Sequence, residues 1–158
     1  MTLTVERPDP TTLVVTRHFA APPDRVFAAH VDPALIRRWC LGPEGWHMPV
    51  CVNDARPGGD FRWEWANGTG AGFHTTGTYE VVEPPREGRP GRIVHVERMF
   101  LPDPTPDNHV ETTFTADGAG TRLTVTMRVA SPETMEAMVA SGMTEGMEVS
   151  YARIDALG

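Results

Sequence analysis

The feature that most limits how this chain can fold is a run of short alternating segments between residues 46 and 129. Each segment places apolar or β-branched residues at every second position, which is typical of a half-buried strand. Turn-forming residues separate the segments, and the linkers are shorter than the helical crossovers that join parallel strands. We therefore predict an antiparallel meander. Its strands cover residues 46–54, 60–65, 73–83, 92–100, 110–116 and 121–129.

The residues before this run predict one more strand and two short helices. Residues 11–19 are rich in β-branched side chains and indicate a strand. Two prolines then open a short helix within residues 21–31, and Asp32 caps a second helix over residues 33–39. Residues 1–10 are polar and contain proline, so we expect a flexible tail there. Residues 11–158 are then one domain.

A long helix is predicted at the C-terminal end of the chain. Ser131 supplies a capping hydroxyl, Pro132 suits the first helical position, and Glu133 places a carboxylate in the first turn. Gly142 and Gly146 interrupt the pattern; they either kink the helix near residue 142 or let a strand approach it closely. The apolar stripe of this helix comprises Met135, Val139, Met143, Met147, Tyr151 and Ile154.

Together these elements predict an α+β fold in which a strongly curved antiparallel sheet wraps around the long C-terminal helix. The two short helices after the first strand would close one end. Phe61, Trp63 and Trp65 occupy alternate positions, so all three would face the helix. A sheet too curved to touch the helix everywhere leaves a cavity between them. The three aromatic side chains are therefore expected to be core, cavity wall, or both.

Composition and charge exclude several classes of function. The net charge of −7 argues against nucleic acid or an anionic membrane as a partner. The chain contains no Lys, which removes lysine Schiff-base chemistry, pyridoxal-phosphate attachment and the phosphate-binding loop that ends in Gly-Lys. Its three Ser lie outside any Gly-x-Ser-x-Gly elbow, so serine-hydrolase chemistry is not expected. No motif requires a cofactor.

The cysteines and the N-terminal sequence bear on location. Cys40 and Cys51 make no disulfide framework, and the first residues lack the charged start and apolar run of a signal peptide. No apolar run approaches the ~18 residues that span a bilayer. We expect a cytoplasmic protein with reduced thiols. His47 and Cys51 lie four residues apart, but on a strand this spacing separates them by more than about 10 Å, so no metal site is predicted.

An ordered set of motifs resembles a known family. The stretches "RHFAAPPDRVFAAHVDPALIRRW", "DARPGGDFRWEW", "GTYEVVEPP", "RIVHVERMF", "GAGTRLTVTM" and "SGMTEGM" are similar to the activator of heat-shock-protein-90 ATPase-like family. That family belongs to the START-like (SRPBCC, birch-pollen-allergen-like) superfamily, whose fold is called helix-grip. The resemblance runs from about residue 12 to the end. It implies a hydrophobic ligand cavity between the sheet and the C-terminal helix.

The chain departs from the family pattern at two positions. Members often carry two successive Trp at the end of the second short helix, where this chain has Trp39-Cys40. Many carry Gly-Trp in the last helix, where this chain has Gly146-Met147. Each change replaces a rigid ring by a smaller or softer group, which would enlarge or loosen that end of the cavity.

The leading functional prediction is binding of a small hydrophobic ligand, aromatic or polyketide-like, by a protein that is a monomer or a homodimer. The alternatives are an enzyme of cyclase or hydrolase type and a co-chaperone-like interaction module. His95 and Glu97 share one strand face; if it looks inward they are a candidate acid–base pair, and if not, the pair is solvated. The candidate ligand-binding residues are Trp39, Trp63, Trp65, Tyr79, His95, Glu97, Met135, Met143, Met147 and Tyr151.

Overall fold

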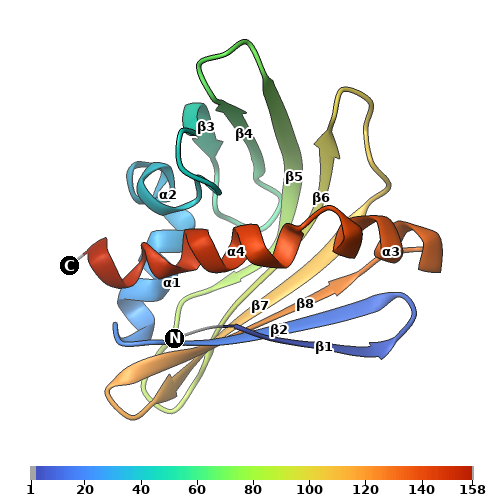
Figure 1. Cartoon of the computed structure of the whole chain (residues 1–158). Helices are drawn as coiled ribbons and strands as arrows, with labels where there is room; N and C mark the ends of the chain where they lie inside the picture. Colours follow the sequence, from blue (N-terminus) through green and yellow to red (C-terminus); the bar gives the residue numbers. More distant parts are fainter. Residues whose placement is uncertain (1–2, 158) are drawn as a thin grey trace.

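The structure is a computed structural model that describes residues 3–157, and it confirms the predicted α+β class. Eight strands form one antiparallel sheet in the spatial order β1-β2-β8-β7-β6-β5-β4-β3 (Figure 1). The predicted meander is therefore β3 to β8. The elements are β1 (Thr4–Asp9), β2 (Thr12–Phe19), α1 (Pro23–Val31), α2 (Pro33–Trp39), β3 (His47–Asn53), β4 (Asp60–Ala66), β5 (Gly72–Glu83), β6 (Gly91–Phe100), β7 (Asn108–Asp117), β8 (Gly120–Arg128), α3 (Pro132–Ala140), α4 (Met143–Ala152) and a 3-10 turn, η1 (Asp155–Leu157).

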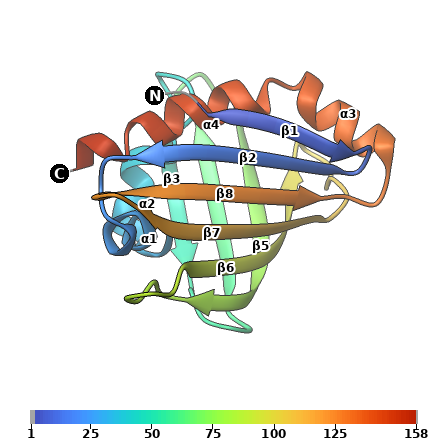
Figure 2. The same ribbon diagram turned by 90° about the horizontal axis from the view of Figure 1, so that it is seen from below.

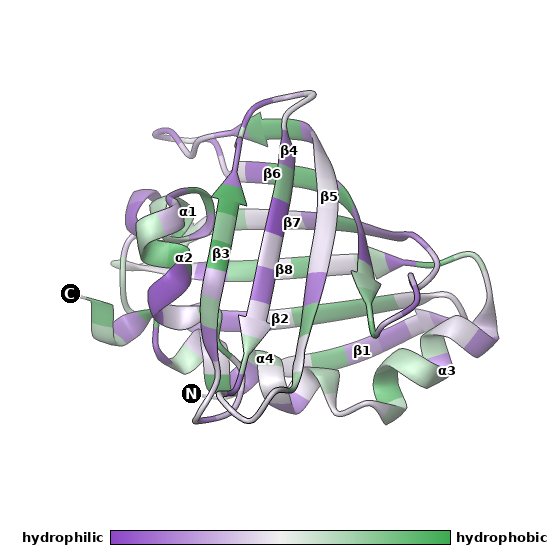
Figure 3. Cartoon of the chain, turned by 90° about the horizontal axis from the view of Figure 1, so that it is seen from above, coloured by the Kyte–Doolittle hydropathy of each residue, from purple (hydrophilic) through white to green (hydrophobic). Residues whose placement is uncertain are grey.

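The sheet is bent so strongly that its two halves cross. Figures 2 and 3 view it from opposite sides, and in both the strands β3 to β5 run across the direction of β2, β8 and β7. Helices α3 and α4 lie along the concave side, and α1 and α2 close one end (Figure 1). The bands of hydrophilic and hydrophobic residues along the strands in Figure 3 follow the alternation that predicted them.

The N-terminal segment differs from its prediction. Residues 1–2 lie outside the described residues, but Thr4–Asp9 is strand β1, paired antiparallel with β2 and not a flexible tail. All six of its residues are exposed, so it lacks the alternation that signals a half-buried strand. Backbone hydrogen bonds to β2 hold it. The ordered domain therefore begins before residue 11.

The predicted C-terminal helix is two helices, broken at Gly142. Ser131 caps α3 as expected, accepting a hydrogen bond from the Thr134 amide. Gly142 adopts a left-handed conformation, with φ of 80°, and α4 begins immediately after it. A Cβ at Gly146 would meet nothing within 4 Å, so no strand approaches there. Of the two explanations left open by the sequence, the break at residue 142 is the correct one.

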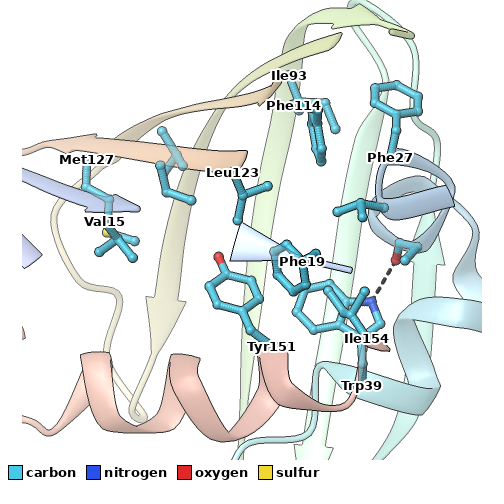
Figure 4. Close-up of a cluster of buried hydrophobic side chains, with 14 of the residues drawn as sticks. Val15, Phe19, Phe27, Trp39, Ile93, Phe114, Leu123, Met127, Tyr151 and Ile154 are labelled. Carbon is cyan, nitrogen blue, oxygen red and sulfur yellow. Dashed lines mark hydrogen bonds between the residues drawn. The ribbon is translucent and has the colours of Figure 1, made fainter. Parts of the chain in front are cut away.

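The core fills the space between the concave face, α1, α2 and α4. Figure 4 shows Leu123 and Phe114 from the sheet meeting Phe27 of α1 and Tyr151 of α4. The edge of the Phe27 ring meets Phe114 at a centroid distance of 5.2 Å. The closed end by α1 and α2 is therefore tightly packed, and side chains that could face a ligand must lie further along the sheet.

Candidate functional site

The aromatic strand β4 faces the interior as predicted. Phe61 lies opposite Gly77 of β5, and a Cβ at Gly77 would come within 2.2 Å of the Phe61 ring. Gly77 therefore makes room for a ring that covers the sheet backbone, and Phe61 is only 2% exposed. Trp63 and Trp65 continue the same face but are half-buried. The aromatic face is therefore buried at Phe61 and partly exposed to solvent at Trp65.

Two contacts fix Trp65. Its indole Nε1 donates a hydrogen bond of 2.7 Å to the carbonyl oxygen of Cys40, at the end of α2. Its ring stacks on Phe73 at a centroid distance of 4.9 Å. Trp63 meets the edge of Trp65 at 6.2 Å, but the buried Nε1 of Trp63 has no hydrogen-bond partner among residues 3–157. Trp65 is thus anchored by a polar contact and Trp63 is not.

His95 and Glu97 point to the concave face. Register places His95 beside Tyr79 of β5, and its ring meets the edge of Phe61 at 5.4 Å. His95 Nε2 lies 2.6 Å from Glu97 Oε1, and the two side chains are 12% and 24% exposed. His95 Nδ1 is buried without a partner among the described residues. The structure therefore forms the predicted polar pair inside an aromatic surround.

A set of rings lies at the closed end, between α1, α2, α4 and β7. His30 meets Trp39 at 4.9 Å and the edge of Phe114 at 5.0 Å, and Trp39 stacks on Tyr151 at 5.6 Å. Trp39 Nε1 donates a 2.7 Å hydrogen bond to the Ala29 carbonyl, drawn as a dashed line in Figure 4. Trp39 and Tyr151, both candidate ligand-binding residues, are buried at this packed end.

His30 is a polar residue of this region that sequence reasoning did not select. Its Nδ1 lies 2.8 Å from the Val26 carbonyl oxygen, one turn earlier in α1. Its Nε2 is buried and has no partner within residues 3–157. Burial lowers the pKa of His30 to about 4, and a smaller lowering comes from the charge of His95. The one available signal was its place on the apolar stripe of the first helix.

The carboxylate of Glu97 lies near several weak acids. Burial raises the pKa of Cys40 to about 12, and Glu97 is the next largest cause. Burial also raises the pKa of Tyr79 and of Tyr151, and in both the negative charge of Glu97 adds to the effect. The Tyr79 hydroxyl donates a 2.6 Å hydrogen bond to Asn53 Oδ1. These groups stay protonated at neutral pH, so neither the Cys40 thiol nor the two phenols supplies a ready nucleophile or base.

The candidate methionines divide into two groups. Met135 is fully buried core. Met143 and Met147 are half-buried on α4 and pack against the same core cluster as Trp63. Trp63 and Trp65 also pack against a second, smaller cluster of Ile36, Met48 and Cys51. Trp63 is therefore the indole that joins the two clusters.

The outer face of the sheet carries a different surface. A depression of about 610 Å³ is lined by outward-facing residues that include Arg62, Thr76 and Arg98. Exposed ion pairs lie on this side, among them the one between Arg98 and Asp107, and such pairs contribute little to stability. Glu97 is also among the residues that line this depression. The predicted cavity between the concave face and α4 stays a prediction.

Within residues 3–157, no three His, Cys, Asp or Glu side chains are grouped so that they could hold a metal ion. No helix in this part of the chain has the length and apolar character of a membrane-spanning segment.

Comparison with known proteins identifies similar sequences and folds. The family model described as "Activator of Hsp90 ATPase homolog 1-like protein" matches residues 20–158. A crystal structure of a Rhodobacter sphaeroides protein has 30% identity and a TM-score of 0.89, covering 99% of this chain and 97% of that one. A crystal structure of protein Ms6760 from Mycobacterium smegmatis has 27% identity and a TM-score of 0.79, covering 98% and 96%. No curated protein matches the sequence.

Proposed function

Because the chain belongs to the activator of Hsp90 ATPase homolog 1-like family, within the START-like superfamily, we propose that it binds a small hydrophobic ligand. The ligand is aromatic or polyketide-like and lies between the concave face of the sheet and helices α3 and α4. The fold alone does not define a function, and the support for ligand binding comes from the side chains on that face.

Trp63 supports the proposal most directly. Its ring is half-buried between two apolar clusters, and its buried Nε1–H has no partner in the described part of the chain. Leaving a buried donor unpaired costs about 1–3 kcal/mol. A ligand against this ring would cover apolar surface and supply the missing acceptor. Apolar walls with a few placed polar groups are typical of small-molecule sites.

The half-buried thioethers of Met143 and Met147 form the helical side of the proposed site. Methionine side chains are flexible and polarisable, so they suit sites that must adapt to an aromatic surface. Both residues follow the break at Gly142, which sets the direction of α4 independently of α3. We therefore place the ligand along the first turns of α4.

The experiment compares Met147→Trp with Val149→Trp, using the uncharged dye Nile red as the probe. A Trp at 147 fills space on the side of α4 that packs toward the sheet, whereas Val149 is exposed. We expect Met147→Trp to weaken dye binding several-fold without lowering the melting temperature, and Val149→Trp to leave affinity unchanged. A lower melting temperature with unchanged affinity would mean that residue 147 lies in packed core, where overpacking costs about 1–3 kcal/mol, and the proposal would fail.

An enzyme is the second candidate, and the 2.6 Å contact between His95 and Glu97 favours it. A carboxylate that orients a histidine is a common arrangement for general acid–base catalysis, which contributes about 10²–10⁴-fold to rate. The test uses the small molecule that co-purifies with the protein from its own host, identified by native mass spectrometry. If wild-type protein converts that molecule and His95→Gln does not, the site is catalytic. If neither protein converts the molecule, binding alone is favoured, and equal conversion by both would exclude His95 from the catalytic step.

A co-chaperone-like interaction module has less support. Its docking surface would require a contiguous exposed apolar patch or a charged face. Within residues 3–157, the large exposed apolar residues come from β1, β3, the segment after β6 and α4, and they are Val5, Val52, Leu101 and Val149. Single exposed apolar residues are common on monomeric proteins and give no independent support for a docking patch.

A further inference from the structure

Five buried side-chain atoms have no hydrogen-bond partner among residues 3–157, and four of them lie on successive strands of the concave face. The four are Trp63 Nε1 of β4, Thr75 Oγ1 of β5, His95 Nδ1 of β6 and Asn108 Oδ1 of β7. The fifth, His30 Nε2, belongs to the packed end by α1 and α2. Buried polar groups are nearly always paired, so four exceptions on one face are candidate contact points for a ligand.

The register of the sheet brings Glu97 and Asn108 together on this face. Glu97 of β6 pairs with Gly77 of β5 on one side and with Asn108 of β7 on the other. Side chains at directly opposed positions have Cβ atoms about 4.5–5.5 Å apart. Gly77 has no side chain, and the Phe61 ring lies so close that a Cβ there would come within 2.2 Å of it. The carboxylate of Glu97 therefore lies between an aromatic ring and the Asn108 amide.

Solvent reaches this level of the concave face. The Glu97 side chain is 24% exposed, and Met143 and Met147 on the helical side are half-buried. At the packed end, by contrast, Phe114 is 0% exposed. A small molecule can therefore approach Glu97, whereas the rings around His30 leave no such access.

The carboxylate of Glu97 has no arginine against it. Its Oε1 lies 2.6 Å from His95 Nε2, which is the one ion pair that Glu97 forms within residues 3–157. The arginines on the inner side are engaged elsewhere, because Arg17 binds Glu148 and Arg153 donates to two backbone carbonyl oxygens. When the His95 ring is neutral, the pair carries one negative charge. A carboxylate in an apolar surround is stabilised by a cation that lies against it.

The charge of Glu97 acts on other groups of the interior. Burial is the main cause of the raised pKa of Cys40 and of Tyr151, and the negative charge of Glu97 adds to it in both. The interior around these residues is therefore unfavourable for a second negative charge and favourable for a positive one.

The polar groups beside this carboxylate are mostly acceptors. Asn108 Oδ1 only accepts, and the Thr75 hydroxyl can accept. His95 Nε2 lies against a carboxylate oxygen, which accepts, so Nε2 carries a proton and Nδ1 of the neutral ring is an acceptor. The rings of Phe61 and Trp63, with centroids 4.7 Å apart, add π faces of the kind that attract cations.

We infer that the ligand is an apolar, ring-containing molecule with one alkylammonium group, which binds against Glu97 and Asn108. This inference rests on the proposed binding function and names the chemistry of the molecule bound. An ammonium group supplies both a positive charge and three donors, so it matches the carboxylate and the unpaired acceptors together. An alcohol of the same shape offers one donor without a charge. Trp63 Nε1–H only donates, so an oxygen elsewhere on the molecule would complete its pairing.

The test uses three probes of one ring system: 2-naphthylmethylamine, 2-naphthylmethanol and 2-naphthoate, titrated by calorimetry at pH 8.0. At this pH the amine is a cation, the alcohol is uncharged and the naphthoate is an anion. We expect the amine to bind roughly ten-fold more tightly than the alcohol, because hydrogen bonds between charged groups are stronger than those of neutral groups. We expect 2-naphthoate to bind most weakly, since it meets the charge of Glu97.

Two variants with the same change of charge locate the contact. Glu97→Gln keeps the shape of the side chain and removes its charge, so the preference for the amine over the alcohol should vanish. Glu80→Gln is the matched control at an exposed position of β5, and there the preference should persist. Melting curves followed by circular dichroism verify that both variants are folded.

The ranking of the three probes by the wild-type protein needs no variant, so it tests the inference even if Glu97→Gln does not fold. Equal binding of the amine and the alcohol, or tighter binding of the naphthoate, would overturn the inference. A preference for the amine that persists in Glu97→Gln would overturn it as well. In each of these cases the proposed binding function stands. If no naphthalene probe binds but Nile red does, the inference alone fails, and if Nile red does not bind either, both fail.

Discussion

At His30, the helix backbone and the surrounding rings constrain the same side chain in different ways. The carbonyl of Val26 fixes which nitrogen carries the proton, and the rings of Trp39, Phe114 and Tyr151 remove the imidazole from water. Among these neighbours no charge compensates a protonated His30, and the nearby His95 opposes it. His30 is thus a buried neutral base, and protonating it lowers the free energy of unfolding of the protein.

His30 therefore predicts a loss of stability in mild acid. Its folded pKa of about 4 lies below the ordinary value of about 6.5, so the unfolded chain binds a proton first as the pH falls. The stabilisation is complete above pH 6.5 and is lost progressively down to pH 4. At pH 5 the loss from this one group is about 2 kcal/mol relative to pH 7.5. Urea unfolding at both pH values measures it.

The variant His30→Gln provides the comparison. It should lack this part of the difference between the two pH values, while His109→Gln, exposed on β7, should keep it. If wild type and His30→Gln lost the same free energy of unfolding between pH 7.5 and pH 5, His30 would not be buried in the neutral form.

The orientation of His95 and Glu97 could not be decided from the sequence. Alternation assigns both residues to one face but leaves the choice of face open. The choice is made by the register with β5, and β5 itself contains an irregularity between Tyr79 and Val81. Tyr79 and Val82 both pack in the core although they are three residues apart, so simple alternation fails there.

At the level of elements, predictions succeeded where a local signal was strong. The caps at Asp32 and Ser131 and the alternation of the meander all located their elements. The turn at Arg56 also has a local cause, because Gly58 adopts a φ of 85° and the Gly59 amide donates a hydrogen bond to the Arg56 carbonyl. Strand β1 was missed because an exposed edge strand carries no apolar period, and its pairing with β2 is not a local property.

The break between α3 and α4 predicts opposite effects for two glycines of the same helical region. Gly142→Ala forces a Cβ into the left-handed conformation at φ of 80°, which costs about 1–2 kcal/mol. Gly146→Ala adds a methyl group inside α4 where nothing lies within 4 Å, and should stabilise the protein by about 0.5–1 kcal/mol. Differential scanning calorimetry of both variants provides the comparison. Equal and favourable effects would mean that the two helices can merge into one.

At the scale of the whole molecule, the carboxylate of Glu148 connects the C-terminal helix α4 to strand β2 and to the N-terminal segment. Glu148 of α4 accepts hydrogen bonds from the side chain of Arg17 in β2 and from the amide of Leu3. Arg17 is only 3% exposed on the concave face, and it also lies 3.7 Å from Asp155 and over the ring of Phe19. Helix α4 is therefore held across the sheet by a partly buried ion pair as well as by apolar contacts.

Replacing Glu148 by Gln should loosen this connection. The variant leaves the buried guanidinium of Arg17 with weaker partners, and we expect a loss of about 1.5–3 kcal/mol in urea unfolding. Hydrogen bonds from Arg17 lower the pKa of Glu148, so its contribution is present above the ordinary carboxylate pKa and is lost as the pH falls below it. Glu145→Gln, exposed on the same helix, should change stability by less than about 0.5 kcal/mol. A loss of equal size in both variants would point to general charge effects.

The strand order has a consequence for how the protein is made. Strands β3 to β8 each pair with the strand next to them in the sequence, but β2 pairs with β8. Val15 of β2 can therefore pair with Val125 only after β8 has been synthesised. At the usual rates of translation that wait lasts roughly 5–20 s. During this time the edge of β2 that β8 will pair with has no partner strand, and Leu13 and Phe19 lack the neighbours that β8 brings to the same face. Until β8 has been synthesised, the first strands of the nascent chain can therefore bind chaperones or pair with the wrong strand.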